Sequence, residues 1–321
     1  MIEKDNETWF RRNRVGLLIV VGGFAAMNAI FLTDAFRGAD SASAEGAGQL
    51  GDFVGGYVGT LFVLLSVWLL YATLHSQRVA QQLQSFEARF FELIKMHRDN
   101  VAEVQLGEAH GRRVFIKIYS ELLAAMEIAR SSVEGLGIRI EQRALLKLAY
   151  YCVFYGVGPN SSRMLRHALG DIDEALVDEM DWKLQDADVC ERVCKEYAIG
   201  YRPFRGHQSR LGHYYRHLYQ SVRYVDQQKI SIDKYDYVKT LRAQLTTHEQ
   251  ALLLVNSLTP VGFNWWKQNL ILDYRMVKNL PKHFFDPLLD LEAPRLFPKG
   301  YFEWEEVHPR SSAAAGARLP G

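Results

Sequence analysis

Two long uncharged stretches dominate the hydrophobic pattern near the N-terminus. Residues 15–33 contain 19 residues without a charge, and residues 53–74 contain 22. A helix rises about 1.5 Å per residue, so the first stretch would be roughly 28 Å long, close to the ~30 Å hydrocarbon core of a bilayer. The pattern therefore predicts two transmembrane helices, at 15–33 and 53–74.

The charges beside these stretches predict their orientation. Basic residues gather in segment 1–14 and again after residue 74, whereas segment 34–52 has one base and four acids. Positive flanks stay on the cytoplasmic side. We therefore expect a cytoplasmic N-terminus, an external loop 34–52 and a cytoplasmic C-terminal region. Ala42-Ser43-Ala44 resembles a signal-peptidase site, so cleavage of the first stretch is the alternative.

Small residues recur at helical spacing along the second stretch. Gly51, Gly55 and Gly59 lie four residues apart, and Gly56 lies beside them. This spacing places small residues on one helix face, where two helices can approach closely. The face can pack against the first helix as a hairpin, or against other copies in a homo-oligomer. Because two helices cannot enclose a conduit, a pore would require several copies.

Helical periodicity continues beyond the second stretch. Apolar positions in residues 75–98 recur at steps of three and four, which predicts a stalk helix or an ordinary core helix. Residues 99–308 lack strand-like alternation, so we expect a helical cytoplasmic domain and a mostly α fold. Helices are expected at about 113–131, 140–155, 171–197, 207–227, 234–259 and 265–280, an irregular aromatic segment at 284–304 and a disordered tail at 309–321.

Composition adds limits to this picture. The chain has 321 residues, with 38 Lys and Arg against 37 Asp and Glu, so the formal net charge is +1. This balance excludes a globally basic nucleic-acid binder but allows a local basic patch. An apolar fraction of 48% excludes a disordered chain. Three cysteines are too few for a disulfide framework and fit a reducing compartment.

The most unusual segment is 201–224, which is rich in arginine, histidine and tyrosine and contains no acid. Arginine forks suit phosphate groups and aromatic faces suit bases, so a nucleotide or RNA site is one hypothesis. The alternative is a half-buried helix whose tyrosines and histidines pack inward. The side chains that we consider for a ligand or sensing pocket, here and on the following helix, are His207, Gln208, Arg210, His213, Tyr214, Arg216, His217, Lys239, Arg242 and Glu249.

Two chemical alternatives involve the same segment. Arg210 and His217 are separated by six residues, which fits the outer limit of the R-x4–6-H signature of HEPN-type ribonucleases. His213 and His217 could instead join Cys190 and Cys194 in a zinc site, although the cysteine spacing differs from the usual C-x2-C pair. Plain core packing of these side chains is the more common outcome.

Further along the chain, Glu249 lies within an apolar helix pattern. A buried glutamate can act as a base, but a hydrogen-bonded structural acid is the more common case. Lys239 and Arg242 are expected to face water or phosphate. No Walker loop, G-x-S-x-G or G-x-G-x-x-G motif occurs, and we expect no cofactor.

Several stretches, in one order, resemble the putative phage abortive infection proteins of bacteria. The resemblance spans roughly residues 50–281, with His248 and Val255-Asn256 as departures where the family is more aromatic. The stretches that carry it are Gly51-Asp52-Phe53-Val54-Gly55-Gly56, Phe90-Phe91-Glu92-Leu93-Ile94, Gly206-His207-Gln208-Ser209, Leu211-Gly212-His213-Tyr214, Arg216-His217-Leu218, 237–245, His248-Glu249-Gln250-Ala251-Leu252-Leu253 and 274–280.

The resemblance implies a two-helix protein of the bacterial inner membrane that acts in defence against phage. It implies no settled active site. Our main hypothesis is an effector whose helical domain senses a phage-derived trigger, or an inhibitory protein or nucleic-acid partner, and whose membrane helices oligomerise and perturb the lipid bilayer. The alternative is a membrane-tethered ribonuclease that uses Arg210 and His217. A sensor without toxicity of its own is a third hypothesis.

Overall fold

The structure, a computed structural model, describes residues 18, 21–25, 29, 44–159, 161–285 and 293–306. Its contacts divide the chain into two units, Met1–Ser85 and Phe86–Gly321. The described chain is mostly helical, which confirms the predicted fold class at that level. Within the described ranges, the strands are limited to a short antiparallel hairpin, β1 (Gln105–Leu106) and β2 (Ala109–His110).

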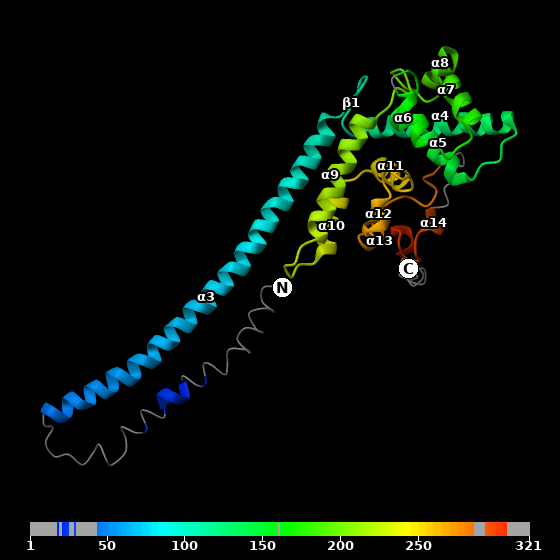
Figure 1. Cartoon of the computed structure of the whole chain (residues 1–321). Coiled ribbons are helices and arrows are strands. Elements are labelled where there is room, and N and C mark those ends of the chain that lie inside the picture. The colour runs from blue at the N-terminus through cyan, green and yellow to red at the C-terminus, as the bar shows by residue number, and fades with distance from the viewer. Residues whose placement is uncertain are drawn as a thin grey trace, which may run out of the picture. The chain divides into compact units, whose positions relative to one another are not determined.

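The longest element is α3, Ala44–Glu103, which continues through the boundary between the two units (Figure 1). The expected external loop 34–52 is helical from Ala44 onward. By length and composition, one helix of the described residues could cross a membrane, the part of α3 that begins at Gly51. The first expected span, 15–33, lies largely outside the described residues, so the two-helix hairpin stays a prediction.

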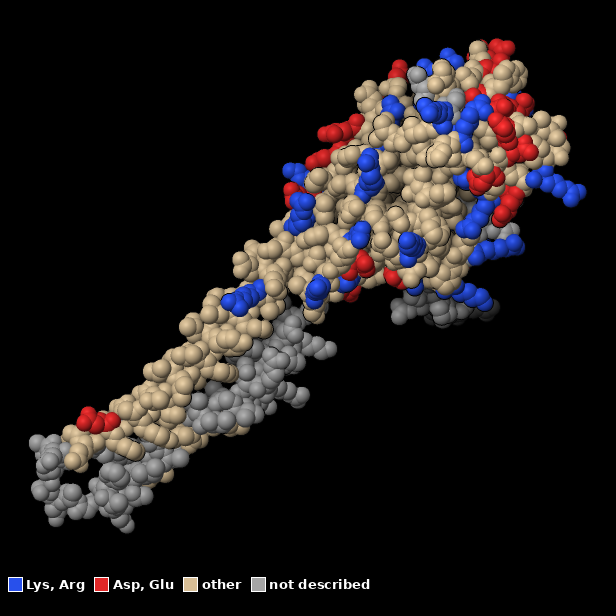
Figure 2. All heavy atoms as spheres, viewed as in Figure 1, with Lys and Arg blue, Asp and Glu red and all other residues tan. Residues whose placement is uncertain are grey.

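The apolar part of α3 exposes its side chains. Phe62, Val63 and Leu64 are each more than half exposed, at 55%, 61% and 62%. The hydroxyls of Thr60 and Ser66 donate to the carbonyl oxygens four residues earlier, so these polar groups are satisfied within the helix. Figure 2 shows almost no charge along this stretch, whereas both signs alternate over the helical domain. Such a surface suits a hydrocarbon environment better than water.

From Phe86 onward, α3 is a core helix of the second unit. Phe86, Phe90, His97 and Val101 are buried at helical spacing. Phe86 stacks on Tyr224 with ring centroids 5.6 Å apart. The segment 75–98, expected as a stalk or core helix, therefore has two parts. Its apolar face is largely exposed up to residue 85 and is buried from Phe86 onward.

The centre of the domain is the pair α4 (Arg112–Leu136) and α5 (Gln142–Tyr155). On α4, Val114, Ile118 and Leu122 are fully buried at steps of four, which is the pattern of an amphipathic core helix. The helix ends at Leu136, and the left-handed φ of 65° at Gly137 lets the N–H of Ile138 bond back to the carbonyl oxygen of Val133 at 3.2 Å. Helix α5 agrees closely with the expected range 140–155, and α4 begins as expected for 113–131 but continues to Leu136.

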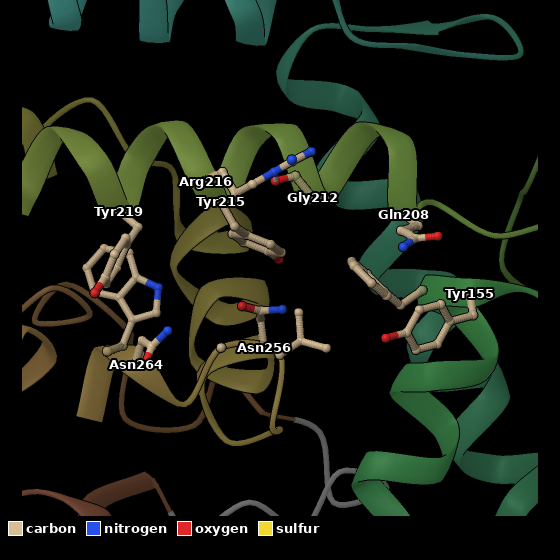
Figure 3. A pocket seen from close by; sticks show the side chains of 12 residues that line it. Tyr155, Gln208, Gly212, Tyr215, Arg216, Tyr219, Asn256 and Asn264 are labelled. Atoms are coloured by element: carbon tan, nitrogen blue, oxygen red, sulfur yellow. Dashed lines mark hydrogen bonds between the residues drawn. The ribbon is translucent and has the colours of Figure 1, made fainter. Parts of the chain in front are cut away.

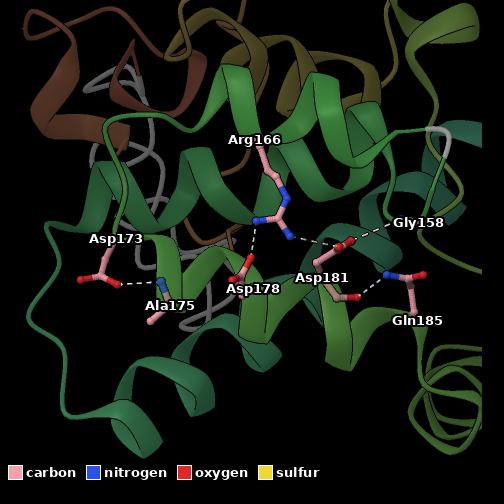
Figure 4. Close-up of polar contacts among 7 residues, drawn as sticks. All are labelled: Gly158, Arg166, Asp173, Ala175, Asp178, Asp181 and Gln185. Carbon is pink, nitrogen blue, oxygen red and sulfur yellow. Dashed lines mark hydrogen bonds and ion pairs between the residues drawn. The ribbon is translucent and has the colours of Figure 1, made fainter.

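Three helices follow: α6 (Ser162–Ala168), α7 (Glu174–Gln185) and α8 (Ala187–Glu196). The single helix expected at 171–197 is wrong, because Asp186 adopts an extended backbone and caps α8 through its side chain. Arg166 of α6 pairs with Asp178 and Asp181 of α7, and Asp181 also accepts from the N–H of Gly158 at 3.3 Å (Figure 4). These contacts hold the α6–α7 corner.

The remaining helices begin with α9 and continue to the last described residues. Helix α9 agrees with the expected range 207–227, but the helix expected at 234–259 is wrong, because Thr246 begins a new helix with a capping box to Glu249. The elements are α9 (Gln208–Asp226), α10 (Lys234–Arg242), α11 (Thr247–Ser257), α12 (Asn264–Lys267), α13 (Leu270–Asp273), α14 (Ala293–Leu296) and the 3-10 helix η1 (Glu303–Glu306).

The C-terminal aromatic segment is part of the core. Tyr301 and Phe302 are almost fully buried, and the Tyr301 hydroxyl donates to the carbonyl oxygen of Ile271 at 2.7 Å. The expectation of an irregular surface segment at 284–304 is therefore wrong for these residues. The expected tail, 309–321, lies outside the described residues.

Candidate functional site

Two glycines hold the end of α5 against the loop that leads into α9. Gly156 follows α5 and Gly206 precedes α9, and both have positive φ, +83° and +87°. A Cβ on Gly206 would lie 2.4 Å from the carbonyl oxygen of Tyr155, and a Cβ on Gly156 would lie 2.6 Å from the nitrogen of Gly206. Glycine is therefore required at both positions.

This backbone crossing positions two side chains that come next to it in the sequence. The N–H of His207 donates to the carbonyl oxygen of Phe154 at 2.9 Å, which ties the first turn of α9 to the last turn of α5. Tyr155, the last residue of α5, and Gln208, the first residue of α9, therefore lie near each other, and both line a cavity.

A buried carboxylate supports the crossing from α4. Glu121 is fully buried and accepts three hydrogen bonds: from the Tyr201 hydroxyl at 2.6 Å, from the Phe204 N–H at 2.7 Å and from the His207 ring at 3.0 Å. Burial and the neighbouring carboxylate raise the pKa of Tyr201, so this phenol stays protonated and donates. A buried acid with this many donors is a structural anchor.

The cavity itself has a volume of about 380 Å³ and lies between α5, α9 and the connection from α11 to α12 (Figure 3). Its lining is aromatic and amidic, contains one arginine and contains no acid. The lining residues are Phe154, Tyr155, Gln208, Gly212, Tyr215, Arg216, Tyr219, Asn256, Val261, Gly262, Asn264 and Trp265.

One face of α9 forms a complete wall of the cavity. Gln208, Gly212, Tyr215, Arg216 and Tyr219 follow steps of three and four, so they share one side of the helix. In Figure 3 they line the cavity from Tyr219 at one end to Gln208 at the other. At Gly212 a Cβ would meet only the Phe154 ring, at 4.0 Å, so the missing side chain leaves open space.

The opposite wall is fixed by a second close contact. The Asn256 side chain is buried and donates to the Tyr150 hydroxyl at 2.8 Å. Gly262 packs directly on it, because a Cβ there would lie 2.4 Å from both the carbonyl and side-chain oxygens of Asn256. The ring of Trp265 is almost fully buried and meets Tyr219 edge to face, with centroids 5.3 Å apart. These contacts orient the wall in advance of any ligand.

Two phenols of the cavity lining differ in their access to it. Burial raises the pKa of Tyr155 and of Tyr215 above the ordinary value, so neither contributes a negative charge. Tyr155 is half-buried and its hydroxyl can donate a hydrogen bond to a ligand, whereas the Tyr215 hydroxyl is buried. The cavity thus offers a donor and one cation.

Four of the expected pocket residues instead belong to the structural core. His207 bonds to Glu121, as described above, and the Tyr214 hydroxyl donates to Glu249 at 3.1 Å. The second Glu249 oxygen accepts from Thr246, so this acid is a helix cap. Arg242, which we expected to face water or phosphate, is buried and donates to two backbone carbonyl oxygens near the end of α13.

The geometry of Arg210 and His217 does not favour RNA cleavage. The Arg210 Nε donates to the carbonyl oxygen of Gln105 at 2.9 Å. Both ring nitrogens of His217 are buried without a hydrogen-bond partner among the described residues, and the ring stacks on His97 at 5.9 Å. A catalytic imidazole must reach the proton that it transfers, and these nitrogens are enclosed.

The zinc site that we considered is not formed. Among the described residues, no group of three or more His, Cys, Asp or Glu side chains could hold a metal ion. The thiols of Cys190 and Cys194 point to backbone carbonyl oxygens at 3.4 and 3.3 Å. His213 is exposed, and His217 lies against His97.

Of the remaining candidates, Gln208 and Arg216 lie in the cavity wall, and Lys239 lies apart from it. Lys239 is exposed and approaches Asp236 at 3.9 Å.

The other ten lining residues were missing from the sequence-based prediction of the pocket, among them Tyr155, Tyr219, Asn256, Asn264 and Trp265. The helical spacing of residues 208, 212, 215, 216 and 219 was the signal that could have separated this wall from the inward face of α9.

These observations define the class of protein. It has a helical domain with a polar and aromatic cavity, and one helix of that domain, α3, also has a long apolar and exposed part. Residues 206–285 match the family described as "Putative phage abortive infection protein". The match confirms the resemblance that the sequence motifs indicated and suggests a role in phage abortive infection. No curated protein and no solved structure matches the chain.

The matched segment and the cavity coincide. All of the lining residues except Phe154 and Tyr155 lie within 206–285. The quoted stretches Gly51–Gly56 and Phe90–Ile94 lie outside the match. The matched segment therefore contributes ten of the twelve residues that line the cavity.

Proposed function

We propose that this chain is an inner-membrane effector of abortive infection, in which the helical domain senses an infection signal and the membrane helices perturb the bilayer. The family match supports the defence role. The exposed apolar part of α3 supports the membrane location. The observation that carries the proposal is that α3 combines, in one uninterrupted helix, this apolar stretch and a buried face that packs against α9 and α10.

The contacts within the domain suggest how a signal would reach α3. Phe86 stacks on Tyr224 of α9 and meets Tyr237 of α10, and His97 stacks on His217. Packed interfaces of this kind shift as units rather than deform gradually. A ligand that repositions α9 would therefore change the packing on α3, and a continuous helix transmits that change along its length.

The glycines of α3 supply the proposed contact between copies. A Cβ on Gly55 or Gly59 would meet no described atom within 4 Å. Larger side chains at these positions therefore leave the described part of the chain undisturbed. They would obstruct close approach by another helix.

The test measures uptake of a membrane-impermeant dye during phage challenge. Cells that express the full chain are compared with cells that express the Gly55→Leu/Gly59→Leu double variant. The matched control is Leu61→Phe, which adds bulk about 200° round the helix from Gly59. We expect early uptake with the parent and the control, and uptake at the level of non-expressing cells with the double variant at equal protein abundance.

Uptake that is absent from the parent during growth arrest would overturn the membrane-perturbing function. Degraded cellular RNA in the same cells, prevented by Arg210→Ala and by His217→Ala, would then assign the ribonuclease alternative. Equal uptake in the parent and the double variant would remove the role of the glycine face.

A further inference from the structure

We infer that the cavity on α9 binds a nucleotide, with the base between aromatic side chains and the phosphate at Arg216. This inference rests on the proposed function and deepens it, because it names the chemical class of the signal that the helical domain senses. The cavity volume of about 380 Å³ lies within the usual range for small-molecule sites, about 300–1,000 Å³.

The charge of the lining selects an anion. Arg216 is the cation of the cavity wall, and no acidic residue lines the cavity. Its Nε donates to the carbonyl oxygen of Gly212 at 3.0 Å, which fixes the plane of the guanidinium group. Arg216 forms no ion pair with a described carboxylate, so its two terminal nitrogens can take a bidentate anion. Phosphate matches that fork.

The aromatic side chains select a planar group. Tyr219 and Trp265 meet edge to face at one end of the cavity, and Phe154 and Tyr155 meet edge to face at the other, with centroids 5.3 and 5.0 Å apart. Figure 3 shows Tyr219 and Tyr155 at opposite ends, with the α9 face between them. Phe154 and Trp265 are almost fully buried, so the half-buried rings of Tyr155 and Tyr219 are the ones that can stack on a nucleobase, irrespective of its identity.

The amides supply recognition of a base edge. Gln208 and Asn264 line the cavity. Among the described residues, neither side chain has a hydrogen-bond partner. Asn256 is held by its bond to Tyr150 and by the packing of Gly262. An amide presents a donor beside an acceptor, which complements the polar edge of a base. An acyl chain would leave these amides unsatisfied, so the lining favours a nucleotide over a lipid.

The first experiment is calorimetric titration of the purified full chain in detergent. The probes are a nucleoside 5′-monophosphate of each base, the nucleosides without phosphate and a ten-residue single-stranded oligonucleotide. We expect at least one monophosphate to bind and its nucleoside to bind about tenfold more weakly, because the phosphate contact is lost. A comparable affinity for the monophosphate and the oligonucleotide identifies a free nucleotide as the source, and an oligonucleotide preference that depends on Arg216 identifies a strand end.

Two pairs of variants locate the binding. Arg216→Met should weaken monophosphate binding about tenfold, whereas Arg223→Met, on the same helix but outside the cavity lining, should not. Gly212→Leu fills the cavity without removing a polar group and should abolish binding, whereas Gly212→Ala should retain it because its Cβ lies at ordinary contact distance. Far-ultraviolet circular dichroism verifies that each variant is folded.

Absence of binding by every probe would overturn the inference, as would binding that persists in both Arg216→Met and Gly212→Leu. Dye uptake in cells is independent of this titration. Failed nucleotide binding with normal dye uptake would remove the ligand assignment and leave the membrane function. Nucleotide binding without dye uptake would remove the membrane function and leave the ligand assignment.

Discussion

The two sides of α9 use the same residue types for different purposes. On the inward side, His207 and Tyr214 bond to the buried acids Glu121 and Glu249. On the cavity side, Arg216 and Tyr219 face open space, and neither pairs with a described acid. Composition alone left two alternatives for segment 201–224, a binding site or a half-buried helix with inward tyrosines and histidines. The face of α9 on which an arginine or tyrosine lies therefore decides whether its side chain bonds within the core or is accessible to a ligand.

The largest effect should follow from breaking the inward side at the backbone crossing. Gly206→Ala forces a Cβ to within 2.4 Å of the Tyr155 carbonyl oxygen at a φ of +87°, so we expect a loss of about 3 kcal/mol or more in the free energy of unfolding. Gly200→Ala is the matched control, since its Cβ would meet nothing within 4 Å. Chemical unfolding in detergent measures both, and equal stabilities would contradict the close packing.

Replacing Glu121, the buried acid that anchors the backbone crossing of Gly156 and Gly206, should lower the free energy of unfolding slightly less. Glu121→Gln keeps the size of the side chain but loses an acceptor for the three donors that converge on it, so we expect destabilisation by about 2–3 kcal/mol. Glu127→Gln is the comparison, because Glu127 is half-buried and accepts a bond from Tyr197. We expect about 1 kcal/mol or less there. A larger loss at Glu127 than at Glu121 would refute the anchoring role.

The inward side should also be sensitive to acid. Burial, His217 and Arg112 lower the pKa of His97 from 6.5 to about 4. Between these values the unfolded chain binds a proton that the folded chain does not, so the free energy of unfolding falls as the pH falls from 6.5 towards 4. From pH 7.5 to pH 5 we expect His97 to account for a loss of about 2 kcal/mol.

The variant His97→Met tests that assignment. Both ring nitrogens of His97 are buried without a hydrogen-bond partner among the described residues, so an apolar side chain of similar length should be tolerated. Unfolding followed at pH 7.5 and pH 5 should show a smaller loss of stability in the variant than in the parent. Identical pH dependence in the two proteins would rule out His97 as the source.

The smallest effect should come from the cavity side. Gly212 lies inside α9, where alanine is favoured over glycine by up to about 1 kcal/mol. Gly212→Ala should therefore raise the thermal midpoint slightly, since its Cβ meets only the Phe154 ring at 4.0 Å. A lower midpoint in a thermal unfolding scan would mean that the space beside Gly212 is filled by the protein itself.

The sequence predicted those elements of the fold whose signals are local. The apolar periodicity of α4, α5 and α9 placed these helices to within a few residues, apart from the C-terminal extension of α4. The prediction joined α7 with α8, and α10 with α11, into single helices. The boundaries lie at Asp186 and Thr246, whose side chains cap the next helix, and sequence alone does not show that these polar residues act as caps. The burial of Tyr301 depends on its distant partner, Ile271, which local pattern cannot show.

The site was predicted in part for the same reason. Gln208 and Arg216 were expected to face a ligand, and they do line the cavity. His207 was a pocket candidate as well, yet its ring bonds to Glu121, a partner that periodicity does not reveal. Glu249 was also a candidate, with a structural acid as the more common case, and it bonds to Tyr214 and Thr246. Tyr155 could not have been linked to Gln208, because the contact depends on two glycines 50 residues apart in the chain.

The crossing of Gly156 and Gly206 also brings together the two ends of one long segment of the domain. The segment between them, which contains α6, α7 and α8, leaves and returns at one place, where the N–H of Val157 donates to the carbonyl oxygen of Phe204 at 2.9 Å. The family match begins at residue 206, directly after this segment. The segment is also anchored at its centre, because Leu176 and Met180 of α7 are fully buried in the core. Closing the long loop at its base therefore fixes its two ends whatever happens along it, and α7 fixes its middle.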